Sequence, residues 1–238
     1  MSLVCEYKKC RRSGLFPVFL AGGLLAAAVP AMNMFFRSEL YLHRPQTPLT
    51  ILLEANWQMM GMLNLFLVLA GASVLYHMEF ADRAFLRMET LPQSMFGMFI
   101  RKYLVLVSVI LMAFALEAAS LAGVSICWFG MTEGMWNELG RQMGCLLVKM
   151  LPALALMLAV SSASENLWIT LGVGVTGIFA ALILSGAGRQ NHILQLFPFL
   201  LPLETAWTDG RLLLAAGAET AAILAAGQGY LCIRRRFR

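Results

Sequence analysis

Three charged side chains lie inside otherwise apolar stretches of the sequence: Glu117, Lys149 and Glu219. A charge at the centre of a membrane costs about 3 kcal/mol or more, so such residues usually have a partner or a function. Lys149 follows Arg141 by eight residues, and Glu219 follows Arg211 by eight. On helices that begin near these arginines, both charges would lie about 12 Å deep. The chemistry open to these residues is therefore ion pairing, or contact with a charged substrate, inside a membrane.

The equal depth of Lys149 and Glu219 allows an ion pair, either within one chain or between two subunits. The alternative is that Lys149 extends toward the headgroups and that Glu219 is protonated or exposed to water. Glu117 lies near the middle of its stretch and has no charged residue at the same depth. We expect it to be protonated or to line a conduit.

No other grouping of residues indicates catalysis, a metal site or a cofactor in this chain. The histidines occur singly, at His43, His77 and His192. Cys5 and Cys10 do not have the spacing of a zinc site. The sequence contains neither a GxxxxGK[ST] phosphate loop nor a GxSxG nucleophile motif. Cys127 and Cys145 lie near the ends of successive apolar stretches, where they could form a disulfide or remain two free thiols.

The composition indicates an all-α integral membrane protein. Of 238 residues, 60% are apolar and 13% are charged, whereas soluble chains have about 25% charged residues. This excludes a soluble enzyme and a nucleic-acid-binding protein. An apolar helix of about 20 residues crosses a bilayer. We therefore expect one transmembrane domain, residues 1–238, with six spans at residues 15–36, 55–78, 103–130, 142–163, 167–187 and 212–232.

The distribution of Lys and Arg predicts the orientation of the spans. Twelve of these residues lie in the N-terminus, in the loop after the second span and in the C-terminus, and five lie on the other face. Cytoplasmic loops are rich in Lys and Arg, so both termini are expected to be cytoplasmic. The basic clusters would bind anionic membrane lipid, which accounts for the net charge of +5. The uncharged stretch 190–203 is too short to cross and contains Pro198 and Pro202, so it is expected to be re-entrant or interfacial.

The long cytoplasmic loop is predicted to begin with an amphipathic helix, residues 79–91, that ends before Pro92. One face carries Glu79, Asp82, Arg83, Arg87, Glu89 and Thr90. Leu86 is the one apolar residue on this charged face. An apolar residue among charges favours docking of a cytosolic partner over a helix that only lies in the membrane interface.

Small residues in the last two spans predict close helix packing. They are Gly172, Gly174 and Gly177 in the fifth span, and Gly217, Ala221, Ala225 and Gly229 in the sixth. Such residues let helix backbones approach each other. We expect this packing within the chain rather than at a seam between two subunits.

The sequence resembles the permease subunits of type-2 ABC exporters. The residues that carry the resemblance are the basic start EYKKCRRSG before six spans, Asn56-Trp57, Glu79, Leu91-Pro92 and Lys102. Within that group, the permeases of lantibiotic-immunity and bacitracin-resistance transporters are most similar. The layout matches along the whole chain, and the specific motifs lie between Asn56 and Lys102. Gln93 departs from the pattern, since the family usually has a small or β-branched residue there.

The resemblance implies how the protein would work in the bacterial plasma membrane. Two six-span subunits, identical or sibling, would form a conduit driven by two cytosolic ATPases that bind ATP and Mg²⁺. Residues 79–91 would be the coupling helix, residues 3–13 an interfacial helix, and residues 190–210 the extracellular gate. The gate includes Pro198, Pro202, Glu204 and Trp207. The expected substrate is a membrane-acting peptide antibiotic, and a carboxylate at Glu117 could guide a cationic one.

Three alternatives remain open at this point. The permease could export another substrate, such as a lipid-linked glycan, haem or a drug. A stand-alone immunity protein could bind the peptide without an ATPase. A membrane-embedded enzyme is disfavoured because no cluster of His, Asp or Ser is present.

Overall fold

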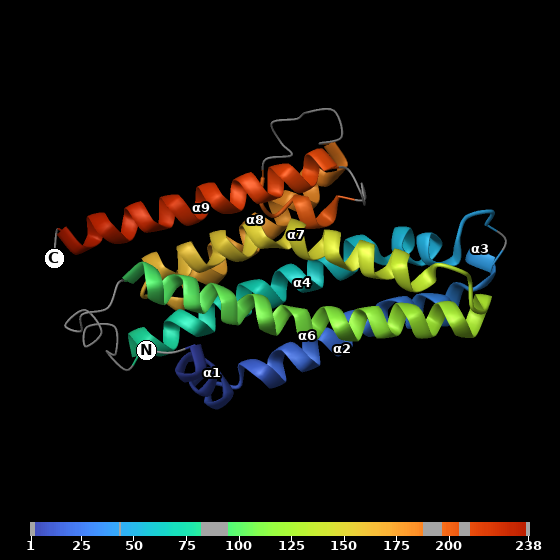
Figure 1. Ribbon diagram of the computed structural model, residues 1–238, viewed down its shortest axis with the longest axis horizontal. Coiled ribbons are helices and arrows are strands. Elements are labelled where there is room, and N and C mark those ends of the chain that lie inside the picture. The colour runs from blue at the N-terminus through green and yellow to red at the C-terminus, as the bar shows by residue number, and fades with distance from the viewer. Residues whose placement is uncertain (1–2, 43, 82–94, 188–196, 205–209, 237–238) are drawn as a thin grey trace.

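A computed structural model describes residues 3–42, 44–81, 95–187, 197–204 and 210–236 of the chain. Six helices in these ranges are long and apolar enough to cross a membrane, as predicted. They are α2 (Leu15–Arg37), α4 (Pro48–Ala81), α6 (Met95–Phe129), α7 (Met135–Ala163), α8 (Leu167–Ala187) and α9 (Gly210–Arg236). Figure 1 shows them side by side in one elongated bundle. The described residues contain no strand.

Three short elements complete the described structure: α1 (Leu3–Arg12), α3 (Glu39–Leu42) and the 3₁₀ turn η3 (Leu201–Leu203). Helix α1 and the end of α9 lie at the same end of the bundle, and α3 lies at the opposite end (Figure 1). The end of α4 and the start of α6 also lie at the end that holds α1. The cytoplasmic location of that end stays a prediction.

Several helices begin earlier than the charge-free windows suggested. Helix α4 begins at Pro48 and includes Glu54, whereas its window began at residue 55. Helix α6 begins at Met95 rather than at residue 103, so Lys102 lies within it. A stretch without charged residues corresponds to the part of a helix that lies in the hydrocarbon core of the membrane. The helix itself can continue into the headgroup layer, because its backbone hydrogen bonds do not depend on apolar side chains.

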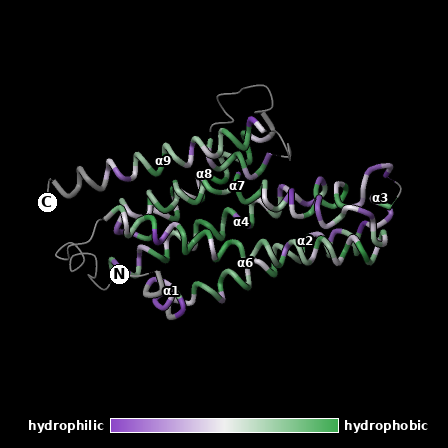
Figure 2. The backbone as a smooth tube through the Cα atoms, viewed as in Figure 1, coloured by the Kyte–Doolittle hydropathy of each residue, from purple (hydrophilic) through white to green (hydrophobic). Residues whose placement is uncertain are grey.

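Helix α4 lies at the centre of the bundle, and α8 and α9 lie at its periphery. In the most apolar stretch of α4, 67% of the residues are buried, against 22% in α8 and in α9. Hydrophobic residues predominate along the long helices (Figure 2). The exposed large apolar side chains of the bundle include Phe35, Phe36, Trp168, Ile183 and Leu214. In a membrane these residues would contact lipid, which does not disfavour apolar surface.

The small-residue prediction is correct for part of α8 and wrong for α9. A Cβ atom added at Gly174 would lie 2.3 Å from the side chain of Leu69, so α8 does pack closely on α4. On α9, by contrast, Gly217, Ala221, Ala225 and Gly229 are all exposed. The face of α9 that packs in the bundle contains Leu212, Ala216 and Thr220. It is turned about 100° from the small-residue stripe, because adjacent residues differ by that angle.

Candidate functional site

Four charged side chains from three helices meet at the end of the bundle that holds α1. We call Glu6 and Lys9 of α1, Glu79 of α4 and Lys102 of α6 the ion-pair group. Lys102 Nζ lies 2.9 Å from Glu79 Oε1 and 4.0 Å from Glu6 Oε2. Lys9 Nζ lies 3.6 Å from Glu79 Oε1 and 3.3 Å from Glu6 Oε1. The four charges balance, so the group is neutral when all are ionised.

The ion-pair group is largely enclosed by protein. The side chains of Glu6, Glu79 and Lys102 are 5% exposed or less, and that of Lys9 is 32% exposed. Lys102 also donates a 2.8 Å hydrogen bond to the Leu75 carbonyl oxygen. Charges removed from water need such partners, because each unpaired one costs several kcal/mol, on the order of 3–5 when a buried pair is broken. The group is therefore a fixed connection between α1, α4 and α6.

The ion-pair group lies near the end of α4 and the start of α6, the two helices that flank residues 82–94. Glu79 is close to the end of α4 at Ala81, and Lys102 lies within the first turns of α6 from Met95. The expectation that Glu79 lies on an exposed docking face is wrong, because its carboxylate is turned into the bundle by the two lysines. The other predicted docking residues lie outside the described residues. They are Asp82, Arg83, Leu86, Arg87, Glu89 and Pro92.

Lys149 occupies a second buried charged site, in α7. Its side chain has no exposed surface. The ammonium donates a 3.1 Å hydrogen bond to the Glu204 carbonyl oxygen and lies 5.9 Å from the centre of the Trp57 ring. An ion pair between Lys149 and Glu219 does not form within the chain, although their similar depth had allowed one. Lys149 therefore joins α7 to α4 and to the segment before α9.

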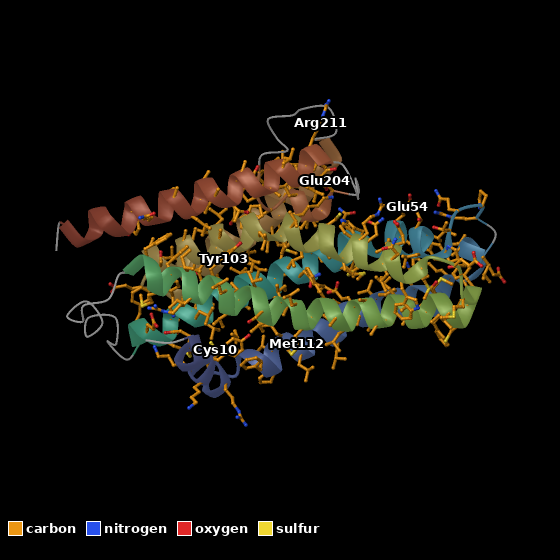
Figure 3. All side chains as sticks on the ribbon, viewed as in Figure 1. Cys10, Glu54, Tyr103, Met112, Glu204 and Arg211 are labelled. Atoms are coloured by element: carbon orange, nitrogen blue, oxygen red, sulfur yellow. The ribbon has the colours of Figure 1, made fainter. Side chains whose placement is uncertain are left out.

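The described part of that segment, residues 197–204, is packed within the bundle. Phe199 through Leu203 are buried, and Pro198 is half-buried. The turn η3 packs against α4, α7 and α8. Irregular backbone is tolerated at membrane depth where protein surrounds it. Trp207, the remaining predicted gate residue, lies outside the described part of the chain. Figure 3 shows Glu204 on the side of the bundle that carries α9.

The other two intramembrane charges differ in their surroundings. Glu117 has no exposed surface and accepts a 3.2 Å hydrogen bond from Asn64 Nδ2 on α4. It does not reach the surface of this chain, so it does not line a conduit in this arrangement. Glu219 is half-buried on α9. Its carboxylate oxygens are enclosed and have no hydrogen-bond partner among the described residues.

Sequence reasoning missed Glu6 and Lys9 as site residues. Glu6 is the only acidic residue before Glu39, within a strongly basic segment. Its three-residue spacing from Lys9 puts both on one face of a helix. This isolated acid was the available signal for an internal ion pair. Elsewhere, Cys127 and Cys145 are free thiols, and the described residues contain no group of three potential metal ligands.

The chain matches a known protein family. The family model described as "ABC-2 family transporter protein" matches residues 2–181, from α1 to near the end of α8. No curated protein and no solved structure matches the chain.

Proposed function

The chain belongs to the ABC-2 transporter family, whose members are membrane subunits that act with a separate ABC ATPase, and from this premise we propose a specific exporter. The chain is the permease half of an ATP-driven pump that expels a membrane-acting peptide antibiotic, of the lantibiotic or bacitracin type. It thereby gives immunity or resistance to a bacterial cell. ATP and Mg²⁺ are bound by the partner ATPase, and a second six-span subunit, identical or sibling, completes the conduit.

The ion-pair group is the observation that carries the coupling part of this proposal. Residues 82–94 connect α4 to α6, and the group joins those two helices to α1 at the base of that connection. A force applied to the connection by an ATPase would therefore reach three helices at once. Tyr7 also donates a hydrogen bond to Ser108, which adds a second contact between α1 and α6.

Helix α1 leads directly into α2 through Gly14, whose φ of 76° is a left-handed conformation that favours glycine. Movement of α1 would thus be passed to the first span over a short link. ATP-driven switching between two packed arrangements of the subunits would push the substrate outward, rather than carry it through a wide pore. The end that holds α1 is the cytoplasmic end in this proposal.

The substrate class rests on motifs in the stretch from Asn56 to Lys102, which resembles the peptide-antibiotic permeases. The structure is compatible with a substrate that reaches the subunit from the bilayer, because α2 and α8 expose apolar side chains. Their exposed side chains include Leu24, Leu25, Phe36, Trp168 and Ile183. A substrate dissolved in the membrane could approach the subunit along such a surface.

The first experiment is a pull-down of the tagged protein from its native cells in a mild detergent, followed by mass spectrometry. We expect a stoichiometric ATPase with a phosphate-binding loop, and a sibling permease if the conduit is mixed. Repeated recovery of the protein alone would contradict the exporter and favour a stand-alone binding protein.

The second experiment tests the substrate. A strain lacking the gene is compared with its parent for sensitivity to nisin, bacitracin, haem and an unrelated lipophilic drug. Increased sensitivity to a peptide antibiotic alone supports the proposed substrate class. Sensitivity to haem or the drug alone, with the ATPase still bound, would replace the substrate but keep the exporter.

A further inference from the structure

We propose that Lys149 is the positioning residue that holds the segment of residues 197–204 seated in the bundle, and that loss of this contact opens the outer side of the permease. The inference rests on the proposed function, since it assigns a gate to that exporter. It combines two features that the sequence presented as unrelated: a charge in one span and a short uncharged segment between two others.

The segment is seated among three helices and has its own local structure. Leu200 N–H donates a 2.8 Å hydrogen bond to the Phe197 carbonyl oxygen, and Leu203 N–H donates a 2.9 Å bond to the Leu200 carbonyl oxygen. Leu200 and Leu201 have no exposed surface. The segment is therefore a compact, apolar unit that could move as a whole.

Glycines on two helices make room for this unit. A Cβ atom added at Gly61 of α4 would lie 3.0 Å from the Pro202 carbonyl oxygen. At Gly177 of α8 it would lie 2.7 Å from the ring of Phe199. Both distances are shorter than ordinary van der Waals contact, so the seat is shaped closely around the segment. Close packing alone would hold it only through apolar contacts, which have no preferred direction.

Lys149 adds a directed contact at the C-terminal end of the unit. Its ammonium is fully buried and donates to the Glu204 carbonyl oxygen, while the Trp57 ring lies on another side of it. Hydrogen bonds from a charged donor are stronger than neutral ones, and an aromatic face also attracts a cation. If the segment left its seat, the buried ammonium would lose an acceptor. The charge therefore favours the seated arrangement, and removing it should favour departure.

The test measures hydrogen exchange by mass spectrometry on the protein purified in mild detergent with its partner. In Lys149→Met, a side chain of similar length without charge, we expect the Leu200, Leu203 and Glu204 amides to exchange roughly tenfold faster or more. Lys149→Arg keeps a cation and should keep most of the protection. Amides in α7 beyond Lys149 should exchange at the original rate in both variants.

A second pair of variants tests the seat without changing any charge. Gly177→Ala places a methyl group against Phe199 and should speed exchange in the segment. Gly172→Ala is its matched control on the same helix, because no atom lies within 4 Å of the added Cβ. Unchanged exchange in Lys149→Met, or an equal increase throughout α7, would overturn the proposal, since the second result would indicate general loosening.

A functional measurement separates this inference from the proposed function. With the ATPase bound and ATP hydrolysis retained, Lys149→Met should lose most peptide protection, whereas Lys149→Arg should keep it. Transport by Lys149→Met at the original level would contradict the role of Lys149 in gating but would not affect the proposal that the protein is an exporter. Absence of an ATPase partner would instead contradict the exporter, while the exchange data would still report whether Lys149 holds the segment.

Discussion

Lys102 and Glu79 lie on either side of residues 82–94, and their charged groups are 2.9 Å apart. This ion pair therefore holds the end of α4 against the start of α6. Glu6 brings α1 to the same lysine, at 4.0 Å. The contacts of the Glu79 carboxylate with the two lysines are ion pairs rather than hydrogen bonds.

Removing Lys102 should strongly destabilise the protein. In Lys102→Met the buried carboxylates of Glu6 and Glu79 would lose their central cation, with an expected loss of about 3–5 kcal/mol in unfolding free energy. Unfolding in detergent, followed by the fluorescence of buried tryptophan, measures this loss. Arg141→Met is the control, because its pair with Glu138 is exposed and contributes less than about 1 kcal/mol.

The double variant Glu79→Gln/Lys102→Met tests whether the pair acts as a unit. Because the variant removes both charges, its loss should be smaller than the sum of the two single losses. Additive losses would show that Glu79 and Lys102 are stabilised independently of each other.

Replacement of Leu86 by Asp should abolish coupled transport and leave the six spans assembled. We expect Leu86 to insert into an apolar notch of the ATPase, and a carboxylate there would be desolvated without a partner. Thr90→Asp is the matched control, since it adds the same charge on the predicted charged face without removing Leu86. Peptide protection and co-purification of the ATPase are measured together. Unchanged protection in the Leu86 variant would refute its role.

Glu117→Gln should preserve the fold and leave protection against a cationic peptide unchanged, because the Glu117 side chain is buried within the chain and does not line a conduit. The amide oxygen of Gln can still accept the hydrogen bond from Asn64, so stability should change by less than about 1 kcal/mol. Glu117→Leu, which removes that acceptor, should cost about 1–3 kcal/mol. Binding of the ATPase should be unaffected in the Gln variant. Reduced protection by that variant, with the fold and ATPase binding intact, would contradict this expectation and give the carboxyl group a part in transport.

Cys10 should react slowly with maleimide compared with Cys127. The Cys10 thiol is buried beside the ion-pair group, and burial raises its pKa, an effect that nearby Lys102 partly opposes. A raised pKa leaves less thiolate at neutral pH, so its rate should increase steeply between about pH 7 and 9. Peptide-resolved mass spectrometry measures both sites in one sample. Equal rates in the folded protein would contradict this placement of α1, and equal rates in SDS serve as the control.

The sequence determined the architecture because the bilayer imposes a simple rule on it. Apolar stretches long enough to cross predict helices, and all six were found among the described residues. Of the proline-containing stretch at residues 190–203, the described part, residues 197–203, contains only the short turn η3. Family membership followed from short motifs, of which Glu79, Pro92 and Lys102 are the clearest.

Only the tertiary structure decided which charges meet. Lys149 and Glu219 have similar depth in the sequence, yet Lys149 contacts a backbone carbonyl at Glu204 instead. Depth along a helix follows from residue number, whereas the direction of a side chain depends on how the helix is rotated against its neighbours. The rotation of α9 likewise leaves Gly217 exposed. The packing of α1 brings Glu6 to Lys102 of α6, although α2 and α4 lie between them in the sequence. Helix rotation is set by the packing of the whole bundle, which no local pattern in the sequence encodes.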